Sequence, residues 1–127
     1  MKTSTKILLF AIFMGSCSLA NAKSVEVWNC KLNDGKSFDD LMVVSSAWLA
    51  ASKSMEGAEG IEAYHEYPAV ANAGDGGFNF VVILPDLEVW GKLAKAYPGS
   101  ASQKADEAWG EVATCKGNSL WASEKIK

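Results

Sequence analysis

The segment 78–84, FNFVVIL, constrains the fold of this chain more than any other, because it is apolar on both sides of a strand. Alternate residues of a strand face opposite sides of a sheet. One side carries Phe80, Val82 and Leu84, and the other carries Val81 and Ile83. An antiparallel sheet with helices on one side only is normally polar on the other side. We therefore expect both faces of this strand to be covered.

The residues before this segment predict a strand, a helix and a second strand. Residues 25–30, VEVWNC, alternate as a strand does. Ser37 then begins a helix, and Asp40 three residues later completes a capping-box pattern. The second strand is predicted over 61–71, and the segment 72–77, NAGDGG, is a hairpin connection whose residues tolerate positive φ.

The residues after this segment predict two helices and a last strand. Asp86 caps a helix with Trp90 and Tyr97 on its apolar face. A third helix is expected over 101–114, and the last strand over 118–126. The order β-α-β-β-α-α-β is typical of an α+β, ferredoxin-like sandwich. Such a sandwich has a four-stranded antiparallel sheet in the order 4-1-3-2, with helices on one face.

The first 22 residues have the pattern of a secretory signal peptide. Lys2 and Lys6 give a basic start, residues 7–14 form a short apolar run, and the tripeptide ANA at 20–22 matches a signal-peptidase site. We expect cleavage after Ala22, a single domain over 23–127, and a periplasmic or secreted protein. The alternative is lipidation of Cys17, but the segment MGSC fits a lipobox poorly.

Cleavage leaves two cysteines, Cys30 and Cys115. An oxidising compartment favours a disulfide between them. A redox or metal pair is the alternative, but the chain has no CxxC motif to support it. In the predicted strand order, the end of the first strand lies beside the start of the last. The predicted disulfide and the predicted topology therefore agree.

The charge of the mature chain excludes some partners. Removing Lys2 and Lys6 from the 12 basic residues leaves 10 lysines against 15 acidic residues, a net charge of −5, and there is no arginine. An acidic chain without arginine is a poor candidate for binding nucleic acid or an anionic membrane surface. Nothing after Ala22 is apolar over a length that spans a bilayer, so no membrane contact is expected after cleavage.

A second copy of the chain is the simplest cover for the outer face of the sheet. The predicted helices are used on the inner face, and no further helix is available. We therefore expect a homodimer that forms through the open sheet face.

The element order, the two-sided third strand and the segment 83–93, ILPDLEVWGKL, resemble the dimeric α+β barrel superfamily. This group includes stress-responsive barrel proteins and monooxygenase-like proteins, and the likeness covers nearly all of the mature chain as a pattern. Some members oxidise small aromatic or polyketide-like substrates, and some bind or degrade haem. Haem-degrading members use an Asn of the first strand, a Trp and a helical His. Asn29 and Trp90 match the first two, and the second helix here carries no His.

His65, the single histidine, is expected on the second strand with Tyr67 on the same face. One hypothesis makes His65, Tyr67 and Asn29 candidates for catalysis or ligand binding in a pocket between two sheets, together with Trp90. The simpler interpretation is a hydrogen-bonded strand histidine, because no second His or carboxylate cluster indicates metal or acid–base chemistry. No metal site and no cofactor is expected.

The five tryptophans all lie in the mature chain. Trp48, Trp90 and Trp109 are expected in the core between helices and sheet. Trp28 and Trp121 are expected side by side on neighbouring strands, and are candidates for ligand binding.

These patterns favour one function and leave two alternatives. The leading hypothesis is a dimeric barrel protein that binds a small apolar or aromatic ligand without established catalysis. The first alternative is a cofactor-independent monooxygenase or haem-handling enzyme. The second is a structural or interaction module, which predicts a barrel without a cavity.

Overall fold

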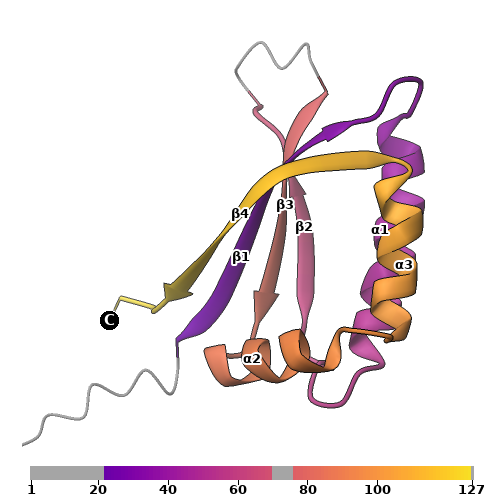
Figure 1. The fold of residues 1–127 in the computed structure, drawn as a ribbon. Helices are drawn as coiled ribbons and strands as arrows, with labels where there is room; N and C mark the ends of the chain where they lie inside the picture. Colours follow the sequence, from indigo (N-terminus) through magenta and orange to yellow (C-terminus); the bar gives the residue numbers. More distant parts are fainter. Residues whose placement is uncertain (1–21, 70–75, 127) are drawn as a thin grey trace, which may run out of the picture.

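The computed structural model describes residues 22–69 and 76–126. They form four strands and three helices (Figure 1). In chain order these are β1 Lys23–Leu32, α1 Phe38–Lys53, β2 Glu62–Glu66, β3 Gly77–Leu84, α2 Leu87–Ala96, α3 Ala101–Gly110 and β4 Ala113–Ser123. Residues 1–21 of the predicted signal peptide and residues 72–75 of the predicted hairpin connection lie outside the described residues.

The four strands make one antiparallel sheet in the order β2-β3-β1-β4. Counted from the opposite edge of the sheet, this is the predicted order 4-1-3-2. The helices pack on one side of the sheet (Figure 1). The prediction of an α+β, ferredoxin-like fold is therefore confirmed.

Side-chain caps determine where the helices begin. Ser37 precedes α1, and its hydroxyl accepts a hydrogen bond from the backbone N–H of Asp40, whose carboxylate accepts one from the N–H of Ser37. Asp86 accepts from the N–H of Val89 at the start of α2 in the same way. Each cap satisfies an N–H group that has no partner within the helix, which contributes about 1 kcal/mol.

Three element boundaries differ from those expected by four residues or more. The second strand ends at Glu66 rather than 71, because Pro68 has no N–H for the strand ladder. The third helix ends at Gly110 rather than 114, and the last strand begins at Ala113 rather than 118. The chain there pairs with β1 along ten positions, and this pairing overrides the local helical pattern.

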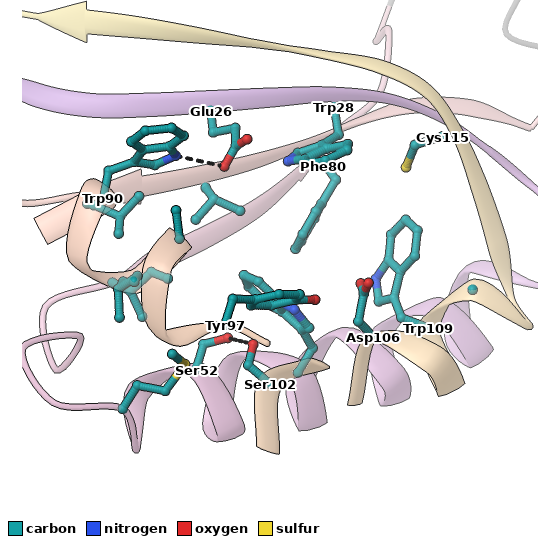
Figure 2. Close-up of a pocket in the computed structure, with 18 of the residues that line it drawn as sticks. Glu26, Trp28, Ser52, Phe80, Trp90, Tyr97, Ser102, Asp106, Trp109 and Cys115 are labelled. Carbon is teal, nitrogen blue, oxygen red and sulfur yellow. Dashed lines mark hydrogen bonds between the residues drawn. The ribbon is translucent and has the colours of Figure 1, made fainter. Parts of the chain in front are cut away.

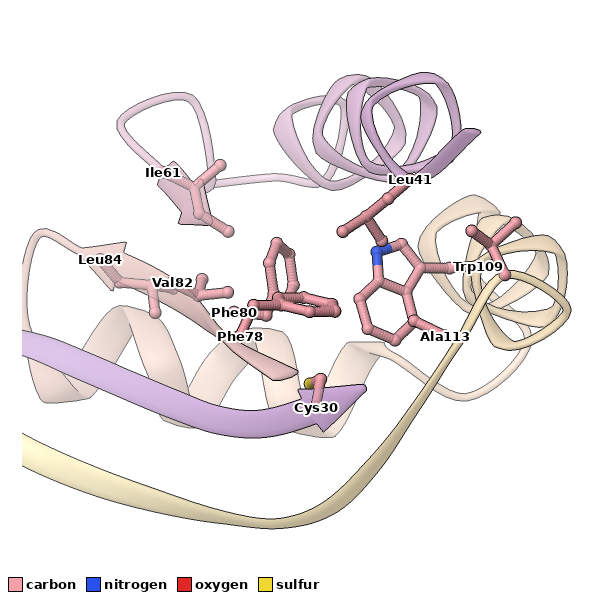
Figure 3. Packing of buried hydrophobic residues seen from close by; sticks show 10 residues of the cluster. Cys30, Leu41, Ile61, Phe78, Phe80, Val82, Leu84, Trp109 and Ala113 are labelled. Atoms are coloured by element: carbon pink, nitrogen blue, oxygen red, sulfur yellow. The ribbon is translucent and has the colours of Figure 1, made fainter. Parts of the chain in front are cut away.

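The core lies between the sheet and the helices (Figure 3). Phe78, Phe80 and Val82 project from β3, and Leu41 and Trp109 reach them from α1 and α3. Full burial of such side chains contributes about 1.5–3 kcal/mol each. One face of the apolar third strand is thus buried against the helices of the same chain.

No helix among the described residues covers the other face of the sheet (Figure 1), although Val81 on this face is already buried. On this face Val25 and Val27 of β1 lie opposite Ile83 and Val81 of β3. Trp121 of β4 lies opposite Val25 and is 61% exposed. We call the patch formed by these five residues the open face.

A register shift in β4 decides which residues reach the open face. Cys30 pairs with Cys115 and forms the expected disulfide, whereas Asn29 pairs with Gly117. One extra residue in a strand moves all later side chains to the opposite side of the sheet. Trp121 therefore lies on the open face while Trp28 packs against the core. The prediction that these two tryptophans lie side by side is wrong.

Candidate functional site

A cavity of about 610 Å³ lies between the helices and the inner face of the sheet (Figure 2). We call it the main cavity. Its lining residues come from all three helices, from β1, β3 and β4, and from the connection before β2. Figure 2 shows their side chains pointing into the space from both layers. Binding pockets for small molecules usually measure about 300–1,000 Å³.

Aromatic rings form much of the wall. Phe80 lies at the centre, with ring centroids 5.2 Å from Trp48 and 5.4 Å from Trp109. Trp28 and Trp90 extend the aromatic surface along the sheet and α2. Such rings present large, rigid apolar surfaces to a ligand at a small cost in side-chain entropy.

Glu26 is an acidic group in this otherwise aromatic wall. It alternates with Trp28 and Cys30 along β1, so its carboxylate faces the helices and not the solvent side. It accepts hydrogen bonds from the indole Nε1 of Trp90 at 3.3 Å and from the amide nitrogen of Asn118 at 2.6 Å. These two donors fix the position of the carboxylate.

A second polar region lies on the helix side of the cavity. The hydroxyls of Ser52 and Ser102 are 2.6 Å apart and join α1 to α3. Burial and the negative charge of Asp106 raise the pKa of the Tyr97 phenol well above its usual range. The phenol O–H of Tyr97 donates a hydrogen bond to Asp106, and its oxygen accepts one from Trp48.

A smaller cavity of about 250 Å³ lies between α1 and β2, at the edge of the sheet. Phe80 lies between the two cavities and lines both of them. The Nε2 atom of His65 lies 2.9 Å from the Ser45 hydroxyl, which accepts a hydrogen bond from Nε1 of Trp109 at 2.8 Å. His65 is therefore a hydrogen-bonded strand residue packed against Phe78 and Phe80.

The comparisons with known proteins identify the architecture. No protein-family model matches the chain, and no curated protein sequence matches it significantly. Solved structures do match. SnoaB, a cofactor-independent oxygenase from Streptomyces nogalater, aligns with a TM-score of 0.60 at 9% identity, covering 83% of this chain and 96% of SnoaB. A proposed antibiotic biosynthesis monooxygenase from Caulobacter crescentus aligns with a TM-score of 0.53 at 13% identity, covering 84% of this chain and 92% of that one.

The chain has the fold of SnoaB and of the Caulobacter crescentus protein. The α+β architecture expected from the resemblance is thus confirmed. At these identities the likeness establishes the fold alone, so the site must be judged from the residues of this chain.

The structure separates the residues expected to form one pocket. Trp28 and Trp90 line the main cavity. His65 and Tyr67 line the smaller cavity behind Phe80. Asn29 lies on the opposite side of the sheet, where its amide donates to Asn79. Within one protomer, the expected pocket formed by Asn29, His65, Tyr67 and Trp90 is therefore not assembled. The cavity lies between sheet and helices, and not between two sheets.

The polar residues of the main cavity were not predicted from the sequence. Tyr97 was expected only as part of an apolar helix face, and Asp106 received no role. Glu26 offered a usable signal, because it is a charged residue on the same strand face as Trp28 and Cys30. An acidic side chain on the core-facing side of a central strand normally needs partners or a function.

Neither a metal site nor a haem site fits the described residues. No group of three or more His, Cys, Asp or Glu side chains able to hold a metal ion occurs among them. The main cavity has no histidine to ligate iron and no Lys or Arg to pair with haem carboxylates within the described part of the chain. Asn29 and Trp90, which match the haem-degrading pattern, lie on opposite faces of the sheet.

No helix among residues 22–69 and 76–126 is long and apolar enough to cross a membrane.

The environment of His65 predicts a pH dependence of stability. Burial lowers its pKa below the usual 6.5, so the unfolded chain binds a proton more readily than the folded protein does. The free energy of unfolding should therefore be largest above about pH 6.5 and should fall as the pH drops from there toward the lowered pKa. Asp40 and Glu62 also have lowered pKa values, but their ordinary values are already 3.8 and 4.5, so they titrate below this window.

Urea unfolding at pH 7.5 and pH 5.0 measures this effect. His65→Gln, which does not titrate, should reduce the difference in unfolding free energy between the two pH values. An equal difference in the variant and in the unaltered protein would show that His65 does not cause it.

Proposed function

We propose that the main cavity binds a small, largely apolar aromatic ligand. The observation that supports this most strongly is a cavity of about 610 Å³ lined by five aromatic side chains of the tryptophan and phenylalanine type. A protein that acts only as a structural module has no need of such a space, because filling the cavity with side chains would stabilise the fold. The polar groups at Glu26 and Tyr97 would orient the ligand.

A cofactor-independent oxygenase is the second candidate, and Glu26 is the observation that favours it. An oxygenase without a cofactor needs a substrate that itself reduces dioxygen, and loss of a proton makes a phenol or enol a stronger reductant. The Glu26 carboxylate lies on the cavity wall and can accept such a proton. The fold shared with SnoaB agrees with this assignment.

Filling the cavity tests ligand binding. Ala94 lines the main cavity from α2, whereas Ala96 lies on the same helix, is exposed and does not line it. In isothermal titration calorimetry with 1-naphthalenemethanol, Ala94→Trp should weaken binding about tenfold or more, because the indole occupies ligand volume. Ala96→Trp adds the same side chain outside the cavity and should bind as the unaltered protein does.

Two outcomes would count against the proposed function. If no aromatic probe of any charge binds, the cavity is not a ligand site for this class. If Ala94→Trp and Ala96→Trp bind equally well, the probe binds elsewhere. Oxygen uptake in the presence of a dihydroxynaphthalene then distinguishes a binding protein from an enzyme. If the protein is an enzyme, the Glu26→Gln variant should lose the turnover that the unaltered protein shows.

We further propose that the mature protein is an exported homodimer. The leader with Lys2, Lys6 and the 20–22 tripeptide supports export and cleavage after Ala22. The disulfide suits a periplasmic or secreted protein. The uncovered apolar open face supports pairing of two sheets. Native mass spectrometry of the protein purified from the cell envelope reports the cleavage site and the number of subunits together.

A further inference from the structure

All charged groups on the wall of the main cavity are negative. They are Glu26 and Asp106, and no Lys, Arg or His lines the cavity within the described part of the chain. Figure 2 shows the two at separate places, with Glu26 beside Trp90 and Asp106 beside Trp109. Tyr97, between them on the helix side, donates its O–H to Asp106 and carries no charge. A ligand anion would be repelled from this wall.

No Lys or His among the described residues forms an ion pair with either of these two carboxylates. The partners of Glu26 are the uncharged donors Trp90 and Asn118. Two accepted hydrogen bonds leave the carboxylate with about two free acceptor positions, since each oxygen can accept two. The ion pairs among residues 22–69 and 76–126 are Lys23–Glu62 and Lys92–Glu88, and neither includes Glu26 or Asp106.

The aromatic wall favours the same ligand charge. Trp28, Trp90 and Trp109 line the cavity near the two carboxylates. The face of an indole ring attracts a cation, and the attraction grows when the cation leaves water. Aromatic rings combined with carboxylates are a favourable environment for a protonated amine, which has both an apolar body and a charge to neutralise.

We propose that the natural ligand of the main cavity is an organic cation, namely an aromatic amine that is protonated at neutral pH. This inference rests on the proposed function and narrows its ligand class. The ring system occupies the aromatic part of the cavity, and the ammonium group donates a hydrogen bond to the Glu26 carboxylate. Asp106, which is exposed, attracts the cation at the cavity wall.

Three probes with the same ring system test the charge preference. 1-Naphthylmethylamine is cationic at pH 7, 1-naphthalenemethanol is neutral, and 1-naphthoate is anionic. In calorimetric titrations the amine should bind at least about tenfold more tightly than the alcohol, and the carboxylate should bind most weakly. Glu26→Gln keeps the shape of the side chain but removes its charge, and should therefore remove the preference for the amine over the alcohol.

A charge-matched control separates a local effect from the overall negative charge of the protein. Glu66 is exposed and lies at the end of β2 away from the main cavity. Glu66→Gln should leave the preference for the amine intact. Equal binding of amine and alcohol, or equal loss in Glu26→Gln and Glu66→Gln, would overturn the inference and leave the proposed function standing. Absence of binding for all three probes would overturn both.

Discussion

The double variant Cys30→Ser/Cys115→Ser is expected to lose about 4–5 kcal/mol of unfolding free energy. The disulfide closes a loop with a sequence separation of 85 residues, and the chain-entropy model assigns about 4.6 kcal/mol to a loop of that length. A domain of this size typically changes its melting temperature by about 4–8 °C per kcal/mol, so the expected decrease is about 15 °C or more. Thermal unfolding followed by circular dichroism measures this decrease.

Reduction of the unaltered protein provides the matched control. Dithiothreitol should lower the melting temperature of the unaltered protein by a similar amount and should not affect the double variant. The same melting temperature with and without the disulfide would show that it does not stabilise the fold. A lower melting temperature in the double variant, without a decrease on reduction of the unaltered protein, would instead indicate that the serines disturb packing around the buried Cys30.

Trp121→Glu is expected to weaken the proposed homodimer by a factor of about 30 or more. Trp121 lies on the open face and is 61% exposed in the protomer, so its replacement costs the protomer little. A tryptophan at the centre of an interface commonly contributes at least about 2 kcal/mol, and a buried, unpaired carboxylate adds a further cost. Sedimentation velocity over a range of concentrations measures the dissociation constant.

Val43→Glu is the control for this variant. Val43 is 71% exposed on α1, which lies on the helix side of the sheet. The same change in charge at that position should leave the dimer intact. Two results would show that the open face is not a dimer interface. The unaltered protein could be a monomer, or the Trp121→Glu variant could form a dimer as strong as that of the unaltered protein.

Much of the fold could be predicted because local signals and global topology agree. Ser37, Asp40 and Asp86 mark helix starts through their own side-chain chemistry, which depends on only a few neighbouring residues. The strand order followed from the element order and agreed with the position of the cysteines. Such features need no knowledge of how side chains pack.

The candidate site could not be predicted in the same way, because it depends on which face each side chain occupies. The register shift beside Cys115 reverses the face of Trp121, and its one local marker, Gly117, lies outside the predicted last strand, which was expected to begin at 118. Asn29 and Trp90 were grouped through a family pattern, although the sheet separates them. Tyr97 and Asp106 meet only when α2 and α3 pack over the sheet, which is a tertiary effect.

The position of β1 within the sheet has a consequence for the order of folding. This first strand is flanked by β3 and β4, both from the second half of the chain. Until β4 has left the ribosome, β1 lacks the partner that fills one of its edges, and Cys30 lacks its bonding partner. Folds with such long-range pairing form slowly. The nascent polypeptide should therefore stay unfolded until β4 is available, which agrees with the proposed export of the chain before it folds.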